Sequence, residues 1–278
     1  MLNILKAVLF GIVEGVTEWL PISSTGHMIL LEEFVRMDVS AQFWDMFLVV
    51  IQFGAILAVV IMYWGNIFPF DLSRKARASH QVNQPKIWRL WGKIILACIP
   101  AAVVGLFLDD WINEHLYNST VVAIMLILFG ILFLVVETKH KGKKPVITST
   151  DDINAKTALI IGLWQLIAAV LPGTSRSGAT IIGALLLGVS RTAAAEFTFY
   201  LAVPVMLGAS VLKIAKFGFH FTGMEAAILL TGMAVAFVVS ILIIRFLMNY
   251  IRKHDFKVFG WYRIVLGIVV LSYFAIAG

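Results

Sequence analysis

Two short polar segments interrupt a chain that is otherwise strongly apolar. The first reads VEGVTEWLPISSTGH over residues 13–27, and the second reads PGTSRSGAT over residues 172–180. Together they hold carboxylates, hydroxyls, an imidazole and a guanidinium, which are the groups needed to bind a phosphate and to move its protons. Both segments are therefore candidates for one site that takes a phosphate ester.

The first segment places two carboxylates ahead of a group of hydroxyls. Glu14 and Glu18 are four residues apart, so on a helix they are neighbours whose like charges repel. In a membrane such a pair needs a bound cation, a shared proton or a basic partner. Two acids that are simply satisfied at an interface are the alternative.

A second helix is predicted to start just after Pro21. Its first residues would be Ser23, Ser24, Thr25 and Gly26, where free N–H groups and the helix dipole suit an anion. His27 reaches the same face as Ser24 and could act as acid or base. A plain serine N-cap and a satisfied polar histidine are the alternatives.

The second segment centres on an arginine. Gly173 and Gly178 allow close backbone approach, and hydroxyls of Thr174, Ser175, Ser177 and Thr180 surround Arg176. The planar guanidinium matches a phosphate, although Arg176 could equally serve as counter-ion to Glu14 or Glu18, and the two roles are compatible. Gln52, inside an apolar run, could line the same cavity or make a helix–helix hydrogen bond.

The composition predicts what must position these residues. The chain has 278 residues, 60% of them hydrophobic and 14% charged, with a mean hydropathy of +0.94, whereas soluble domains carry about 25% charged residues. Apolar runs of roughly membrane-spanning length occur at 47–64, 94–108, 121–136, 197–212, 226–244 and 264–277. We therefore expect an all-α polytopic membrane protein with six transmembrane helices.

The net charge of +6 is unevenly placed. Basic residues cluster at 74–89, 139–156 and 252–263, and the stretch 109–120 has acids but no Lys or Arg. This asymmetry predicts three cytoplasmic loops, which include Lys86, Arg89 and Arg263, and an outer loop at 109–120. No basic surface is interleaved with stacking aromatics, so nucleic acid is not an expected partner.

The two polar segments sit in stretches that echo each other. Gly11 precedes Pro21 by ten residues, as Gly162 precedes Pro172; Glu14 and Gln165 share an offset, and so do Ser24 and Ser175. We expect a first repeat at 1–137 (hairpin 2–36 plus three spans), a basic cytoplasmic linker at 138–157 and a second repeat at 158–278 (hairpin 158–189 plus three spans).

Each polar turn breaks an apolar stretch, because proline disrupts the helix before it. Two half-helices that meet at a polar turn make a re-entrant hairpin, which is tolerated where it is buried in protein. The basic loops give the two hairpins opposite orientations, so we expect an inverted repeat with both turns near the bilayer middle and both termini outside.

The segments EGVTEWLPISSTGH and LPGTSRSGAT, with the duplicated spans around them, resemble the bacitracin-resistance family of undecaprenyl-pyrophosphate phosphatases over essentially the whole chain. The resemblance implies hydrolysis of undecaprenyl diphosphate to the monophosphate carrier lipid of cell-wall and peptidoglycan synthesis, in the bacterial cell membrane. It also implies a divalent cation, Mg²⁺ or Ca²⁺. Carried over by motif, the site comprises Glu14, Glu18, Ser24, Thr25, His27, Ser175 and Arg176.

These residues receive the following expected roles. Glu18, Ser24, His27 and Arg176 are catalytic, with Glu18 more critical than Glu14, and both glutamates hold the metal. Ser23, Thr25, Gly26, Gln52, Thr174, Ser175, Ser177 and Gly178 bind substrate. Either Ser24 attacks phosphorus while His27 takes its proton, or His27 or the metal activates a water.

Partners and setting complete the expectations. A polyprenyl diphosphate lipid and membrane lipids are the expected partners, and a homodimer is left open. The site should open to the outer face, where glycan polymerisation leaves the diphosphate lipid. A transporter or polyprenyl-phosphate translocase using the same inverted repeat is the alternative function.

Overall fold

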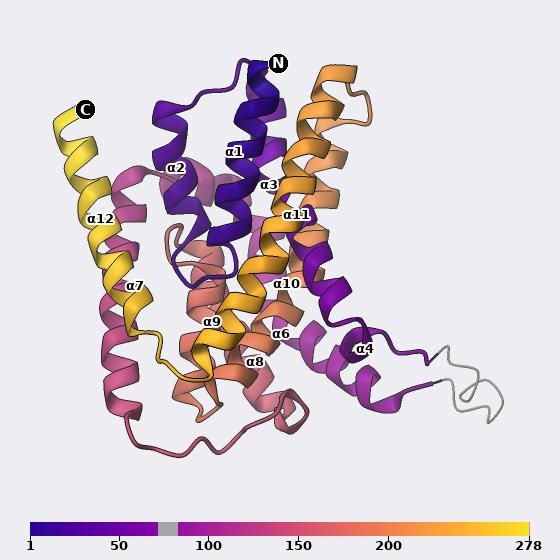
Figure 1. Cartoon of the computed structure of the whole chain (residues 1–278), viewed down its shortest axis with the longest axis vertical. Coiled ribbons are helices and arrows are strands. Elements are labelled where there is room, and N and C mark those ends of the chain that lie inside the picture. The colour runs from indigo at the N-terminus through magenta and orange to yellow at the C-terminus, as the bar shows by residue number, and fades with distance from the viewer. Residues whose placement is uncertain (72–82, 278) are drawn as a thin grey trace.

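Helices make up nearly all of the regular structure in the computed structural model, which describes residues 1–71 and 83–277 (Figure 1). In chain order they are α1 (Leu2–Thr17), α2 (Ser24–Phe34), α3 (Ala41–Met62), α4 (Trp64–Ile67), α6 (Pro85–His115), α7 (Ser119–His140), a 3₁₀ turn (Thr150–Asp152), α8 (Ala155–Val170), α9 (Arg176–Leu186), α10 (Arg191–Phe217), α11 (Gly223–Ile251) and α12 (Lys257–Ala277).

Six of the described helices are long and apolar enough to cross a membrane. They are α3, α6 over Pro85–Leu108, α7, α10, α11 and α12. Each of the six predicted runs falls on one of them, and large apolar side chains such as Phe107 and Leu230 point outward from the bundle. The prediction of an all-α multi-pass membrane protein is therefore confirmed.

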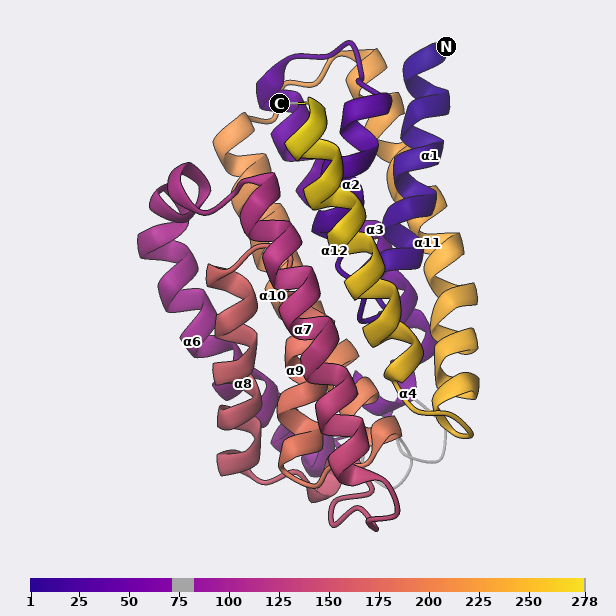
Figure 2. The same cartoon turned by 90° about the vertical axis from the view of Figure 1, so that its left-hand side faces the viewer.

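The termini and the loops divide between the two ends of the bundle. Both termini lie at one end, and the α7–α8 and α11–α12 connections lie at the other (Figures 1 and 2). The Lys86 ammonium pairs with Asp151 at 2.6 Å, which brings the start of α6 to that second end. Basic stretches thus share one end, as predicted. Arg74, Lys75 and Arg77 lie outside the described residues.

The outer loop predicted at 109–120 is wrong in its extent. Helix α6 continues through His115, so only residues 116–118 connect it to α7. The segment DDWINEH contains neither Gly nor Pro, so nothing in it ends a helix. Lys86 and Arg89 likewise lie in the first turns of α6 and not in a loop, because Pro85 is pre-organised to begin a helix.

Two pairs of short helices hold the polar segments. Helices α1 and α8 have 16 residues each, and α2 and α9 have 11 each. The two pairs enter the bundle from opposite ends (Figure 2). Helix α1, from the N-terminal half of the chain, packs on α11 in the C-terminal half, and α8, from the C-terminal half, packs on α6 in the N-terminal half. The repeat boundaries themselves stay a prediction.

Glycine makes these two packings close. A Cβ on Gly11 would lie 2.6 Å from the carbonyl oxygen of Gly232 in α11, and one on Gly162 would lie 2.2 Å from that of Ala97 in α6. Small residues let helix backbones approach in this way in membrane proteins. The first helix of each short pair is therefore packed tightly against a long helix, and this packing fixes the position of the polar turn along the bundle.

Candidate active site

The first polar turn spans residues 18–23, between the end of α1 and the start of α2. Ser23 caps α2: its Oγ accepts a hydrogen bond from the Gly26 amide at 3.4 Å, and its φ is 73°. Helix α2 begins at Ser24, as the sequence predicts. A non-glycine residue at positive φ is strained, and such strain is characteristic of functional sites.

The second polar turn repeats this geometry. Ser175 caps α9, with φ 69° and with its Oγ accepting from the Gly178 amide at 3.2 Å. Ser23 and Ser175 are therefore the equivalent caps, and Ser24 corresponds to Arg176. The expected correspondence of Ser24 with Ser175 is wrong, because the second turn carries one extra residue between its proline and its cap.

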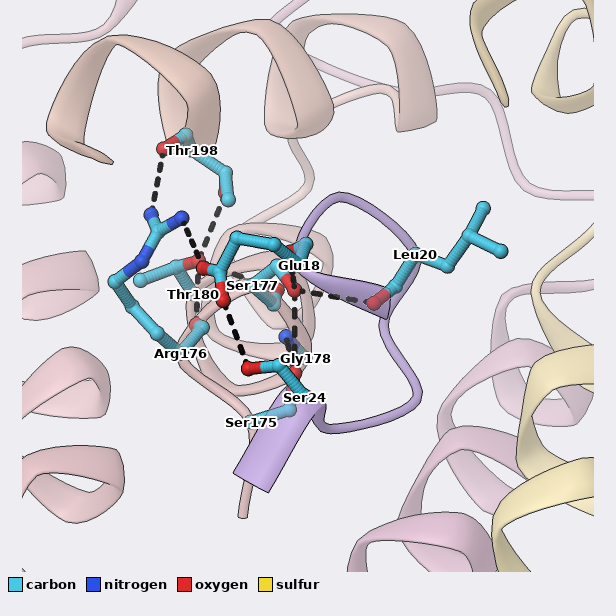
Figure 3. A network of polar contacts seen from close by, with 9 residues as sticks. All are labelled: Glu18, Leu20, Ser24, Ser175, Arg176, Ser177, Gly178, Thr180 and Thr198. Atoms are coloured by element: carbon cyan, nitrogen blue, oxygen red, sulfur yellow. Dashed lines mark hydrogen bonds and ion pairs between the residues drawn. The ribbon is translucent and has the colours of Figure 1, made fainter. Parts of the chain in front are cut away.

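The two turns touch each other (Figure 3). The Ser177 hydroxyl donates to the carbonyl oxygens of Glu18 at 3.1 Å and Leu20 at 3.4 Å, so α9 is bonded directly to the first turn. The N-terminal ends of α2 and α9, with their free N–H groups and positive dipole ends, consequently meet in one region. The structure thus brings together the two segments that the sequence singled out.

The Glu18 carboxylate is the centre of this contact. Its Oε1 accepts from Nη2 of Arg176 at 2.9 Å, and its Oε2 accepts from the Ser24 hydroxyl at 2.8 Å. The ion pair is nearly enclosed, with 13% of the Arg176 side chain and 7% of the Glu18 side chain exposed. Arg176 is steadied further by the Thr198 carbonyl oxygen of α10, 3.0 Å from Nη1.

Glu14 is buried beside this pair, close enough for Glu18 and Arg176 both to act on its charge. Only 1% of it is exposed, and among the described residues its Oε1 has no hydrogen-bond partner. It lies near the C-terminal end of α1, where the helix dipole disfavours a carboxylate and the last turn of the helix itself has no basic residue. A buried carboxylate oxygen of this kind fits a hard divalent cation.

Other buried polar atoms are also without partners among the described residues. Those at or near the two turns are both side-chain polar atoms of Gln165, Oγ1 of Thr174, Nε of Arg176, Nε of Arg263 and Nε1 of Trp19, whereas Tyr200, Ser210 and Ser240 have such atoms elsewhere on α10 and α11. Gln165 occupies in α8 the place that Glu14 occupies in α1. Buried polar groups are normally satisfied, so this concentration around the two turns marks a region prepared for a polar ligand.

No set of three or more His, Cys, Asp or Glu side chains gathers into a metal centre within the described residues. A cation here would have Glu14 and Glu18 as its acidic ligands. Magnesium is commonly held in this way, by one or two carboxylates together with the phosphates of a substrate. The donor set therefore fits a cation that binds along with a phosphate ester.

His27 lies apart from Ser24. Its Nδ1 is 2.7 Å from the Ser23 carbonyl oxygen, and its Nε2 is 2.7 Å from the hydroxyl of Tyr262, whose ring stacks on the imidazole. Because a carbonyl only accepts, the partners place the proton of a neutral ring on Nδ1 and let Tyr262 donate to Nε2. Both ring nitrogens are engaged away from the Ser24 hydroxyl.

The remaining predicted residues divide between the network and its surroundings. Thr174 lies buried in the second turn, and Gly178 and Gly26 are buried in the first turns of α9 and α2. Thr25 lies beside Tyr117 of the 116–118 connection. Gln52 is half-buried on α3 and outside the network of Figure 3.

Arg263 is also misplaced by the sequence, which predicts it in a cytoplasmic loop. It lies on α12 and is fully buried. Its Nη1 donates to the Pro21 carbonyl oxygen at 3.2 Å, and its Nη2 donates to those of Gly173 at 2.9 Å and Thr174 at 2.8 Å. One guanidinium thus joins both turns.

A signal for Arg263 was present in the sequence. It follows the aromatic pair Trp261–Tyr262 and directly precedes the apolar run 264–277, whereas the other basic residues of that cluster stand in the polar segment 252–257. An arginine at the edge of a span is readily counted with the loop, although an arginine inside a membrane segment is a candidate functional residue.

Comparison with known proteins identifies relatives of the whole chain. Residues 7–269 match the family described as Bacitracin resistance protein BacA. The undecaprenyl-diphosphatase of Desulfitobacterium hafniense is 59% identical over 275 residues, which are 99% of this chain and 97% of that protein. That of Enterococcus faecalis is 57% identical over 275 residues (99% and 98%), and undecaprenyl-diphosphatase 1 of Clostridium acetobutylicum is 59% identical (99% and 98%).

Proposed function

Because the chain belongs to the Bacitracin resistance protein BacA family, we propose that it is a membrane phosphatase that hydrolyses undecaprenyl diphosphate. The products are undecaprenyl phosphate and inorganic phosphate. Undecaprenyl phosphate is the carrier lipid, which returns to peptidoglycan and cell-wall synthesis, and the reaction confers bacitracin resistance. The names of its relatives support this enzyme and give no support to a transporter or translocase.

One observation carries the proposal: a serine hydroxyl and an arginine share a buried carboxylate at two converging helix N-termini. Ser24 Oγ is 2.8 Å from Glu18 Oε2, which is hydrogen-bonding distance for proton transfer. Arg176 is held on the other carboxylate oxygen, its Nε has no partner among the described residues, and its planar set of donors matches phosphate oxygens. Enzymes catalyse phosphoryl transfer mainly by positioning the nucleophile and by placing charges that stabilise the phosphoryl oxygens.

The mechanism that this geometry supports begins with Ser24. Its oxygen attacks the terminal phosphorus, the proton passes to Glu18, and the bond between that phosphorus and the bridging oxygen breaks, which releases undecaprenyl phosphate. Arg176 stabilises charge on the phosphoryl oxygens. Water then cleaves the phosphoserine to give inorganic phosphate and free Ser24, with Glu18 as the proton carrier.

This proposal gives the proton of Ser24 to Glu18 and a supporting role to His27. The expected pairing of Ser24 with His27 is not seen in the structure, since the imidazole bonds to Ser23 and Tyr262. His27 therefore holds the first turn of α2 against α12. Direct attack by water, with Ser24 only binding the phosphate, is the competing mechanism.

A divalent cation, Mg²⁺ or Ca²⁺, is part of the proposal. Glu14 and Glu18 would hold it, since the Glu14 Oε1 is buried and has no partner among the described residues. When bound, the cation would neutralise diphosphate charge. Ser23, Thr25, Gly26, Thr174, Ser175, Ser177 and Gly178 would surround the phosphates through hydroxyls and helix N–H groups, with Gln52 at the margin.

In the membrane, we propose that the two short helix pairs are re-entrant hairpins of opposite orientation. Their turns meet inside the bundle, and they approach it from its two ends (Figure 2). The site would open toward the outer face, the end that carries both termini. Carbonyl groups of the turns are tolerated at that depth because Arg263 and Ser177 satisfy them.

The decisive experiment measures phosphate release from undecaprenyl diphosphate by purified protein in detergent. Ser24→Ala should lower the rate by far more than tenfold, because losing a true nucleophile typically costs several orders of magnitude. Ser240→Ala is the matched control, since Ser240 is buried on α11 outside the network. A trapped phosphoserine in a quenched reaction supports Ser24. A Ser24→Ala enzyme that keeps more than about a tenth of the rate would establish attack by water.

A further inference from the structure

A cavity lies at the end of the bundle opposite the termini. It has a volume of about 690 Å³ and is bordered by the end of α7, the α7–α8 connection, the end of α9, the start of α10 and the end of α11. None of its lining residues belongs to the Glu18–Ser24–Arg176 network. The proposed hydrolysis leaves this cavity without a role.

The lining of this cavity is strongly cationic. Lys143, Lys144 and Arg252 contribute three positive charges, and His140 lies beside them. Glu137 is the one acidic residue of the lining, and Arg191 already neutralises it through two contacts, Nε to Oε1 at 2.9 Å and Nη2 to Oε2 at 2.5 Å. The charge left over is positive, which selects an anionic ligand.

The ion pair between Glu137 and Arg191 also holds together the elements that border the cavity. Glu137 is only 1% exposed, and its Oε1 also accepts from the amide of Phe256 at 3.0 Å. One buried carboxylate therefore joins α7, α10 and the segment between α11 and α12. Helix α10, which starts at Arg191, adds the positive end of its dipole to the cavity wall.

Apart from Ser190 and Thr192, the other side chains of the lining are apolar. Val146, Leu185, Leu187, Val189 and Ile251 contribute to it. A free phosphate ion needs neither this volume nor these side chains, whereas a lipid headgroup with the start of its chains uses both. Basic pockets at the cytoplasmic ends of transmembrane helices recognise anionic lipid headgroups by this combination.

We propose that this cavity binds the phosphate headgroup of an anionic membrane phospholipid. Lys143 and Lys144 contact the phosphate together with Arg252, and the apolar side chains receive the glycerol backbone and the first carbons of the chains. The site is separate from that of the diphosphate substrate and holds its lipid without reacting with it. Helix α9 connects the two, with Arg176 at one end and Leu185 near the other.

The test uses the full-length protein in a neutral detergent and follows its thermal unfolding. Dihexanoyl phosphatidylglycerol is added to wild type, to the double variant Lys143→Gln with Lys144→Gln, and to the control Lys139→Gln with Lys141→Gln. The control removes the same charge from the same stretch of chain, but neither of its lysines lines the cavity. Dihexanoyl phosphatidylcholine and inorganic phosphate are tested in parallel.

We expect phosphatidylglycerol to raise the Tm of wild type and control by about 3 °C or more, and to leave the Lys143/Lys144 variant unchanged. An equal rise in both double variants would show that the basic stretch attracts anions without a site, and would overturn the proposal. An equal rise in Tm with phosphatidylcholine would show that the ligand needs no net negative charge, and would overturn the assignment to an anionic lipid. An equal effect of inorganic phosphate would assign the cavity to a free anion and overturn the assignment to a lipid.

Discussion

Glu18 is bonded to both candidate catalytic groups, while Glu14 lies one helical turn earlier in α1. Replacing Glu18 with Gln removes the charge partner of Arg176 and the proton acceptor of Ser24. Turnover of Glu18→Gln should fall by roughly a hundredfold or more, the typical contribution of a positioned base. Steady-state phosphate release across a series of metal concentrations measures it.

Glu14→Gln is the matched variant, with the same change one turn away. It should lose less turnover than Glu18→Gln and require more divalent cation, because the amide is a weaker ligand than the carboxylate. If Glu14→Gln proves the weaker enzyme, the cation at Glu14 is the dominant contribution and the assignment of the base to Glu18 fails.

Substitutions of Arg176 distinguish the effect of its positive charge from the effect of its planar donor geometry. Arg176→Lys keeps the positive charge beside Glu18 but loses the planar donor set, so turnover should fall by roughly a hundredfold while the protein inserts and still binds lipid. Arg176→Ala should be worse and should also lower the Tm, because it leaves a buried carboxylate unpaired at a cost of about 3–5 kcal/mol. Near-normal turnover of the Lys variant would reduce Arg176 to a counter-ion.

At the residue scale, the motifs predict which side chains carry chemistry, but they could not show which of these side chains meet. Glu18 and Arg176 are 158 residues apart in the chain, and no periodicity links positions at that separation. His27 shows the same limit, since spacing alone put it near Ser24 and could not foresee Tyr262. Partners from distant helices are fixed only by tertiary packing.

At the element scale, the second turn contains a glycine at which any side chain would be strained. Gly173 has a φ of +88°, and a Cβ there would lie 2.5 Å from the carbonyl oxygen of Val122 in α7. Gly173→Ala should lower the free energy of unfolding by at least about 1 kcal/mol from the left-handed backbone alone, with the clash adding to it.

The thermal unfolding of purified protein in detergent checks this. Gly208→Ala is the control, because a Cβ at Gly208 in α10 meets no other atom within 4 Å, so alanine there should be neutral or slightly stabilising. Equal melting temperatures for the two variants would mean that the second turn does not need the conformation of Gly173.

The apolar runs predict that the long helices exist, but they do not predict the residues at which these helices end. The six runs lie on six long helices, but α6 extends to His115 because residues 109–115 include no Gly or Pro, and every other residue type costs a helix less than about 1 kcal/mol. The short helices were foreseen from Pro21 and Pro172, which fall in the turns themselves. Packing partners such as α1 with α11 lie beyond what a local pattern can specify.

At the scale of the whole molecule, the orientation in the membrane is the property that decides which lipid reaches the site. Single cysteines at Glu114 and Lys141, both exposed, report on the two ends of the bundle. The native Cys98 is buried. In intact cells, a membrane-impermeant thiol reagent should label Glu114→Cys at once and Lys141→Cys only after permeabilisation, as the positive-inside rule requires. The reverse pattern would invert the proposed topology and move the site opening to the cytoplasm.

Contacts between segments far apart in the sequence also set an order in which the structure can form during synthesis. Helix α1 packs on α11, which is synthesised much later. Arg263, whose guanidinium bonds to the carbonyl groups of Pro21 and Gly173, belongs to α12 and is made later still. A nascent chain that has passed the second polar turn therefore holds both turns before the guanidinium that joins them has been made.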